Sequence, residues 1–234
     1  DVTERRVIGG NPFLDPEEAL GGDLSLEWYY ATASILSLGA FYRQIDNVIY
    51  QDVTLVDGGT YVPAAAGQQW QLLGAANGRN GELSGIEANF MFSGQDFLPG
   101  VLGGSGFSAN VTLIDSEFET LDGRTLGLPG TSDVIYNMSV FYENYGLSAR
   151  LNYQYRDEWI SPIEDPEEVW GEMERVDATF MYDLPIDLGG ARASVYANLN
   201  NLTDETDVRF AGNGTINQSE SFGRHYMVGV RINY

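Results

Sequence analysis

Polar side chains alternate along one short segment and form the best candidate surface for binding a solute. Arg150, Asn152, Gln154 and Arg156 occupy every second position, and Trp159 follows three residues later. Amide and guanidinium groups hydrogen-bond hydroxyls and carboxylates, and an indole ring packs on the apolar face of a sugar. This set therefore predicts a surface for a polar solute. The alternative is that these side chains hold another part of the protein by hydrogen bonds.

The residue types give little support to catalysis or to metal binding. The 234 residues contain no cysteine and one histidine, His225, which excludes thiol catalysis and any site that needs two imidazoles. His225 and Ser221 lack the G-x-S-x-G elbow of a hydrolase, so we expect His225 to line a polar surface. Carboxylate pairs act in glycosidases, but the acids here fall in predicted loops without an enzyme framework. We expect no enzymatic activity, no catalytic residue and no cofactor.

The charge balance excludes nucleic acid as a partner. With 12 arginines, no lysine and 34 acids the formal charge is 12 − 34 = −22, whereas a phosphate backbone requires a basic surface. No stretch approaches the roughly 18 consecutive apolar residues of a membrane helix. The mean hydropathy of −0.20 would suit a soluble domain. It would also suit a transmembrane barrel, whose strands need only ~9–11 residues and present one face to lipid.

The elements that would carry these side chains are strands, because apolar residues recur at every second position between turn residues. In the last thirteen residues one face carries Phe222, Arg224, Tyr226, Val228, Val230, Ile232 and Tyr234. The same alternation predicts eight further strands, around residues 24–30, 36–42, 86–92, 107–113, 136–142, 149–155, 176–182 and 193–199. A hairpin turn at 77–81 would add a tenth strand but would reverse the sidedness of everything before it. We therefore predict one long, irregular strand over 70–92.

Two details favour a membrane barrel over a soluble β-sandwich or barrel. The polar faces combine arginine, asparagine, glutamine and glutamate, as a wet lumen would, and the apolar faces end in Tyr or Trp, like interfacial girdles. Short links alternate with long ones. The short links lie at 31–34, 143–146 and 183–190, the long ones at 46–69, 116–133, 157–171 and 201–221, and the long link at 93–106 is the exception. Since external loops of such barrels are the longer ones, we expect the long set outside and the C-terminus in the periplasm.

Several motifs resemble the TonB-dependent outer-membrane receptors. Residues 11–18 (Asn-Pro-Phe-Leu-Asp-Pro-Glu-Glu) and 23–30 (Asp-Leu-Ser-Leu-Glu-Trp-Tyr-Tyr) are similar to that family's "GNPxLxPE … xLxLEWY" segment. Residues 85–87 (Gly-Ile-Glu), 200–205 (Asn-Asn-Leu-Thr-Asp-Glu) and the closing strand match in the same order. The resemblance runs from about Gly10 to Tyr234. Residues 97–117 are similar to a proteobacterial subgroup linked to carbohydrate import.

The resemblance implies an all-β fold, a transmembrane antiparallel up-and-down β-barrel, of which this chain would supply about nine C-terminal strands out of 22. Residues 1–22 would be an external loop that leads into the first strand, and residues 23–234 the barrel strands. The family's N-terminal plug domain and TonB box match nothing here. An open sheet in hydrocarbon would leave unpaired backbone edges, so the missing strands are also a physical requirement.

The implied function is import of a scarce nutrient across the bacterial outer membrane, energised by the TonB complex through the plug. An oligosaccharide is favoured as the substrate, with a ferric siderophore as the alternative. A plugless passive porin-like channel and a structural or adhesion barrel are the rivals from other classes.

The expected partners are outer-membrane lipid and lipopolysaccharide, the missing plug and strands, the TonB complex and the barrel-assembly machinery. The last of these would read Tyr226, Val228, Val230, Ile232 and Tyr234, although a lipid-facing last strand needs the same pattern.

An acidic segment at 164–174 (Glu-Asp-Pro-Glu-Glu-Val-Trp-Gly-Glu-Met-Glu) resembles a calcium site at first sight. It lacks the Asp-x-Asp-x-Asp-Gly spacing of an EF-hand loop, so we expect a solvated external loop and no metal site. The alternative is a divalent cation that bridges this loop to lipopolysaccharide or to a neighbouring molecule.

Overall fold

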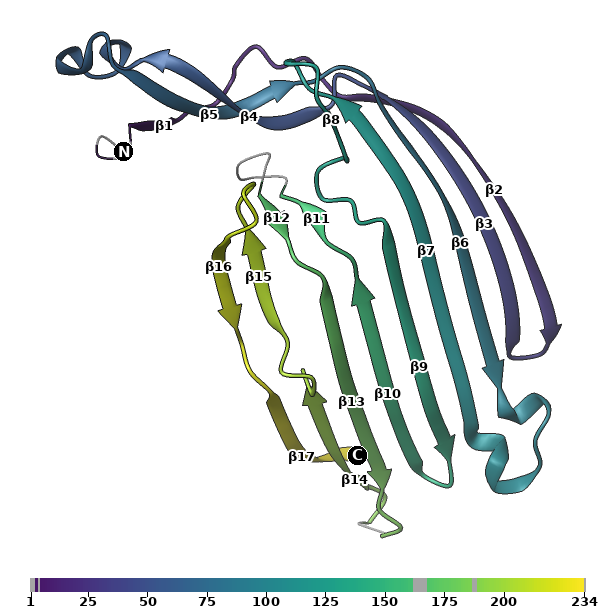
Figure 1. The fold of residues 1–234 in the computed structure, drawn as a ribbon. Helices are drawn as coiled ribbons and strands as arrows, with labels where there is room; N and C mark the ends of the chain where they lie inside the picture. The colour runs from purple at the N-terminus through teal and green to yellow at the C-terminus, as the bar shows by residue number, and fades with distance from the viewer. Residues whose placement is uncertain (1–2, 4, 162–167, 187–188, 234) are drawn as a thin grey trace.

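One curved antiparallel sheet dominates the computed structural model, which describes residues 3, 5–161, 168–186 and 189–233 (Figure 1). Among these residues its nine long strands pair in chain order: β2 (Glu18–Ala31), β3 (Ser34–Asp46), β6 (Gly81–Ser93), β7 (Ser105–Glu119), β9 (Val134–Asn144), β10 (Leu147–Arg156), β13 (Met173–Asp183), β14 (Arg192–Asn200) and β17 (His225–Asn233). The short strand β8 (Thr125–Leu126) adds to β7. The predicted strand count is confirmed. Among the described residues, no helix is long and apolar enough to cross a membrane.

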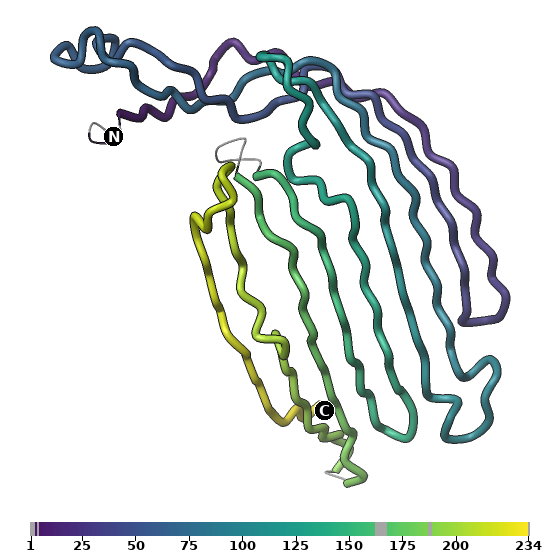
Figure 2. Tube along the Cα trace, viewed as in Figure 1, coloured from purple at the N-terminus to yellow at the C-terminus, as the bar shows by residue number. Residues whose placement is uncertain are grey.

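Short links gather at one end of the sheet and long connections at the other (Figure 2). The β2–β3, β9–β10 and β13–β14 links lie at the short-link end, and so does the end of β17. The β6–β7 link, with η3 (Gly94–Asp96) and η4 (Gly100–Gly104), also lies there. In η3 the Asp96 carboxylate accepts hydrogen bonds from the Ala33 N–H at 3.0 Å and the Ser34 hydroxyl at 2.7 Å. This exceptional link is therefore fixed to its neighbouring turn.

The connection between β3 and β6 forms a projecting arm (Figure 1). It contains β4 (Ile49–Asp57), η1 (Gly58–Thr60), η2 (Pro63–Ala65) and β5 (Gln69–Asn77), and β1 (Arg6–Ile8) pairs with β5 in parallel. The base of the arm packs against the main sheet in a small core of Ile45, Val48, Tyr50, Phe118 and Leu128. The rings of Tyr50 and Phe118 lie 5.2 Å apart, and the Tyr50 hydroxyl accepts a hydrogen bond from the Leu121 N–H at 3.2 Å. The arm is thus anchored at its base.

The prediction of one strand over 70–92 is wrong, because β5 and β6 belong to different sheets. Between them the Gly78 N–H donates to the Val48 carbonyl and the Arg79 N–H to the Glu119 carbonyl, both at 2.7 Å. A Cβ at Gly81 would lie 2.9 Å from the Val48 side chain, so glycine permits this close crossing. The chain therefore turns out of the main sheet here, and the predicted long loop at 46–69 holds a strand of its own. Near the N-terminus, the first long strand, β2, begins at Glu18, five residues before the start of the strands expected at residue 23.

The two faces of the main sheet differ in composition. One face, called the apolar face below, exposes large apolar side chains at alternate positions: Leu24, Leu26 and Trp28 in β2, Leu38 in β3, Ile86 in β6, Val140 in β9, Leu151 in β10, and Tyr226, Val228, Val230 and Ile232 in β17. Leu24 and Val228 are each 77% exposed, which in water would be costly over so wide a surface. The opposite face, the polar face, carries amides, hydroxyls and charges.

Three aromatic rings lie against the polar face, each over a glycine of the neighbouring strand. Phe41 pairs with Gly85, Phe141 with Gly106, and Tyr196 with Gly229. A Cβ at any of these glycines would lie within 2.1–2.5 Å of ring atoms, so only glycine lets the rings lie flat. These three large side chains on the polar face therefore lie flat against the sheet and do not project from it.

A second, four-stranded sheet lies at the long-connection end. Its order is β11 (Trp159–Ile160), β12 (Val169–Trp170), β15 (Thr206–Phe210) and β16 (Ile216–Ser221), so it joins two separate connections of the main sheet.

The closing strand begins later than predicted. Gly223 has a positive φ of 67°, which breaks the extended chain, and β17 starts at His225. Phe222 consequently does not share the apolar face with Tyr226; it lines a pocket together with His225.

Candidate functional site

A row of carboxamides crosses the polar face at one height. The register places Asn89 beside Asn110, Asn110 beside Asn137, and Asn137 beside Gln154. We call these four residues the amide row. The Asn137 amide donates to the Asn110 carbonyl oxygen at 3.0 Å. Each carboxamide offers both donors and an acceptor, so the row presents an uncharged hydrogen-bonding band across four adjacent strands.

A parallel row lies two residues nearer the short-link end. It contains Ser108, Ser139, Asn152, Asp177, Asn200 and His225. The predicted residues Asn152 and Gln154 therefore stand in adjacent rows, about 7 Å apart along β10. With the described residues, neither side chain makes a hydrogen bond.

The other three predicted residues are engaged within the protein. The Arg150 guanidinium donates to the Ser139 hydroxyl at 3.2 Å, lies 3.5 Å from a Glu143 carboxylate oxygen, and sits 4.6 Å from the centre of the Phe141 ring. Arg156 donates to the Ser132 hydroxyl at 2.8 Å and to the Gly130 carbonyl at 2.7 Å. Both arginines thereby hold neighbouring strands or connections, and ligand binding by this set stays a prediction.

Two indole rings, stacked on each other and flanked by two guanidinium groups, extend from Arg156 across the small sheet. The Arg156 guanidinium lies 3.8 Å from the centre of the Trp159 ring, the Trp159 and Trp170 rings lie 5.4 Å apart, and the Arg209 guanidinium lies 3.8 Å from the Trp170 ring. Such cation–π contacts contribute ~0.5–2 kcal/mol each. The stack joins the β10–β13 connection to the β14–β17 connection, and the Trp159 ring is packed against Arg156 and Trp170.

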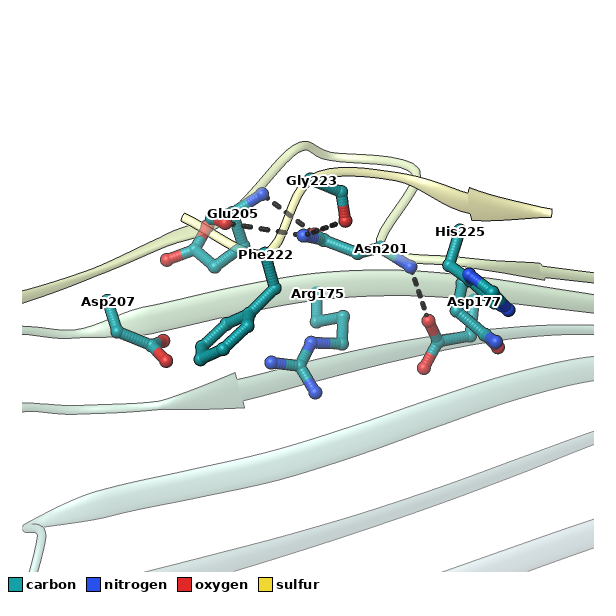
Figure 3. Close-up of a pocket in the computed structure, with 9 residues that line it drawn as sticks. Arg175, Asp177, Asn201, Glu205, Asp207, Phe222, Gly223 and His225 are labelled. Atoms are coloured by element: carbon teal, nitrogen blue, oxygen red, sulfur yellow. Dashed lines mark hydrogen bonds between the residues drawn. The ribbon is translucent and has the colours of Figure 1, made fainter. Parts of the chain in front are cut away.

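A pocket of about 510 Å³ opens on the polar face where β14 ends and β17 has not begun (Figure 3). Its lining includes Arg175, Asp177, Asn200, Asn201, Glu205, Asp207, Phe222, Gly223 and His225. The expectation that His225 lines a polar surface is confirmed. The alternation of the sequence missed the rest of this lining, since its members come from four strands, β13, β14, β15 and β17, and from the segments between β14 and β15 and between β16 and β17.

The Asn-Asn-Leu-Thr-Asp motif builds one wall of the pocket. Asn201 takes a positive φ of 55°, and its amide donates to the carbonyls of Gly223 at 3.1 Å and Glu205 at 3.3 Å. Its side-chain oxygen accepts from the Glu205 N–H at 2.7 Å, and its own N–H donates to Asp177 at 2.8 Å. The buried residue Asn201 thus joins three segments: its side chain connects the turn after β14 to the approach to β17, and its backbone N–H bonds to Asp177 of β13.

Charged groups in the pocket are only partly paired. Among the described residues, the Arg175 Nε is buried without a hydrogen-bond partner. Burial raises the pKa of Glu205 above its usual value because the charged form loses hydration, and the nearby carboxylates of Asp207 and Glu174 act in the same direction. The pocket therefore offers an unused donor beside several acceptors.

The acidic segment is only partly within the described residues, since 164–167 lie outside them. Glu168 is buried, and one of its oxygens accepts from the Asn217 amide at 2.6 Å. Within the described ranges, no group of three or more histidine or acidic side chains is arranged to hold a metal ion. Tyr234 of the closing strand also lies outside the described residues.

The family model described as "TonB dependent receptor-like, beta-barrel" matches residues 2–202. The chain belongs to the TonB-dependent receptors. Membership in this family identifies the main sheet as part of a transmembrane barrel wall in a Gram-negative outer membrane, with its apolar face toward lipid. The resemblance noted in the sequence is thereby confirmed.

The fold of the chain is also similar to that of part of a solved receptor structure. A mutant of the ferric enterobactin receptor of Pseudomonas aeruginosa is similar to this TonB-dependent receptor chain, with a TM-score of 0.59 and 16% identity over 93% of this chain. At that identity the likeness concerns the fold. The chain spans 31% of the length of that receptor. No curated protein matches the sequence.

Proposed function

We propose that this chain is the C-terminal barrel part of a receptor that imports an oligosaccharide or a similar polyhydroxylated nutrient. The amide row is the observation that carries the proposal. Sugar hydroxyls both donate and accept hydrogen bonds, and an uncharged band of carboxamides matches them without favouring ions. Of the predicted binding set, Gln154 belongs to the amide row and Asn152 to the parallel row beside it, whereas Arg150, Arg156 and Trp159 would hold the neighbouring strands and connections in place.

The energy source and topology belong to the same proposal. A plug domain and further strands, up to 22 in all, would complete the barrel, and TonB would act on the plug. The long connections, the arm and the small sheet would face outward, and β17 would end in the periplasm, where the barrel-assembly machinery reads its residues. Lipid and lipopolysaccharide would contact the apolar face. We expect passage without covalent change, so no enzymatic step is proposed.

The runner-up is a ferric siderophore, a ligand that often carries negative charge. It is favoured by the two arginines on β10 and by the name of the similar solved structure. The contacts of Arg150 and Arg156 with Ser139, Glu143, Ser132 and Gly130 reduce their availability for such a ligand.

The test is uptake by cells that express the full-length receptor with Asn110→Leu and Asn137→Leu together, compared with Asn213→Leu in an exposed turn. We expect the double variant to lower uptake of fluorescent oligosaccharides at least several-fold, and growth under iron limitation to be unaffected. Loss of iron-limited growth with unchanged oligosaccharide uptake would support the siderophore instead. Vancomycin sensitivity reports a displaced plug, which separates plug holding from ligand contact.

A further inference from the structure

The pocket exists because two paired strands stop at different places. Asn200 is the last residue of β14 and pairs with His225, the first residue of β17. Beyond this pair the chain leaves for the small sheet, so through Arg175 β13 pairs with β10 on one side and has no paired strand on the side of β14. Figure 3 shows the side chains of Phe222, Arg175 and Asp207 below the two segments that carry Asn201 and Gly223, which a hydrogen bond joins. The resulting space of about 510 Å³ is larger than a single sugar ring requires.

Donors and acceptors are both left over in this space. The buried Arg175 Nε has no partner among the described residues. Among those residues, the Asp177 carboxylate accepts one hydrogen bond, from the Asn201 N–H at 2.8 Å. Asp207 and Glu205 add further acceptors. The Nε itself carries no exposed surface, so a ligand meets the rest of the Arg175 guanidinium together with these carboxylates, which supply donors and acceptors side by side.

Phe222 provides an apolar surface beside these polar groups. Its side chain is 78% exposed although it lines the pocket. An aromatic ring next to carboxylates and a guanidinium suits a ligand with polar edges and an apolar C–H face. A sugar ring has this combination.

Other ligand classes fit less well. Three carboxylates face one guanidinium, so an anion would meet net repulsion. A metal ion needs a cluster of ligands that the described part of the chain does not provide. The mixture of a guanidinium, several carboxylate acceptors and an aromatic ring matches a neutral polyhydroxylated ligand, whose hydroxyls both donate and accept.

We propose that this pocket is a subsite that binds one sugar residue of the imported oligosaccharide, with Phe222 packing on the ring and Arg175 and Asp177 bonding its hydroxyls. The inference rests on the proposed function. Asp177 pairs with Asn152 and Arg175 with Gln154, so the pocket is continuous with the rows that cross the polar face. A chain held here by one sugar unit could contact the amide row with the next units.

The test is calorimetric titration of the purified full-length receptor with neutral disaccharides, namely maltose, cellobiose, xylobiose and chitobiose. Phe222→Ala and Arg175→Met should each weaken binding of the recognised disaccharide by about tenfold, the loss expected for one ring contact or one charge-assisted hydrogen bond. Phe13→Ala, at an exposed aromatic outside the pocket, and Arg79→Met, at an exposed ion pair with Glu119, are the matched controls and should leave affinity unchanged.

The outcomes separate the two proposals. Equal binding by wild type, Phe222→Ala and Arg175→Met would overturn the subsite and leave oligosaccharide import standing. Binding of a ferric siderophore with no binding of any disaccharide would overturn both. Heat-modifiable migration on a gel shows for each variant that the barrel is folded. Asp177→Asn keeps an acceptor for the Asn201 N–H and should also weaken binding, which gives a third test of the same pocket.

Discussion

Replacing Asn201 by alanine should destabilise the barrel more than any other single change in the connection between β14 and β17. The alanine removes the amide bonds to Gly223 and Glu205 and the oxygen that accepts from the Glu205 N–H. Three bonds of about 1 kcal/mol each give a loss of about 3 kcal/mol. The positive φ of 55° adds about 1 kcal/mol for alanine, so the total is about 4 kcal/mol.

Two comparison variants divide this total into its parts. Asn201→Gly loses the same hydrogen bonds but tolerates the positive φ, so it should lose about 3 kcal/mol. Asn213→Ala, in an exposed turn where the side chain accepts from the Thr215 N–H at 3.0 Å, should lose no more than about 0.5 kcal/mol.

The assay is unfolding of the full-length receptor by guanidinium in detergent, followed by heat-modifiable migration and by circular dichroism. Equal midpoints for Asn201→Ala and Asn213→Ala would refute the role of Asn201 in joining three segments. Equal midpoints for Asn201→Ala and Asn201→Gly would refute only the contribution of the backbone conformation.

Three further predictions concern other parts of the chain. The Thr120 hydroxyl and Arg124 hold the pKa of Asp122 below its usual value, so this turn gains stability that is complete above about pH 4 and is lost as the pH falls through the lowered pKa. The protection factor of the Arg124 amide, which is its exchange rate relative to the intrinsic rate at the same pH, should therefore fall in acid, and Asp122→Asn should abolish this pH dependence. Trp170→Ala breaks the stack of rings and guanidinium groups and should cost about 2–3 kcal/mol, seen as faster proteolysis of the long connections while the main sheet stays intact; unchanged cleavage would contradict the stack's role. Deleting Tyr234 should lower the amount of heat-modifiable barrel in the outer membrane, and normal amounts would speak against an assembly signal.

Alternation of residue types predicted the main sheet well because one face of each strand meets lipid. Residues such as Leu24, Leu26 and Val228 are apolar at every second position for that reason alone, and no tertiary contact is needed to explain them. The prediction was wrong at Gly78 and Gly223, where the chain leaves the sheet. A glycine interrupts a strand only where the backbone adopts a positive φ or where another segment crosses closely over it. The sequence does not reveal at which glycines these conditions hold.

The candidate site was predicted only where it follows a single strand. Asn152 and Gln154 face the polar side because of their phase in β10. The partners of Arg156 come from residues 130 and 132, and those of Trp159 from Trp170 and Arg156, through packing of separate connections. The pocket was missed because Arg175, Glu205 and Phe222 are distant in sequence. The Asn-Asn-Leu-Thr-Asp motif marked its position, but only the structure gives its hydrogen bonds.

The paired indoles of Trp159 and Trp170 also make the long connections visible by spectroscopy. Two rings whose centres are 5.4 Å apart couple their strong electronic transitions, which produces two bands of opposite sign in far-ultraviolet circular dichroism. Trp28 lies on the apolar face and Trp70 in the arm, so neither has such a partner among the described rings. Opening of the small sheet would separate the two indoles and remove this pair of bands from the spectrum. Movement of these connections during ligand binding could therefore be followed without attaching a label.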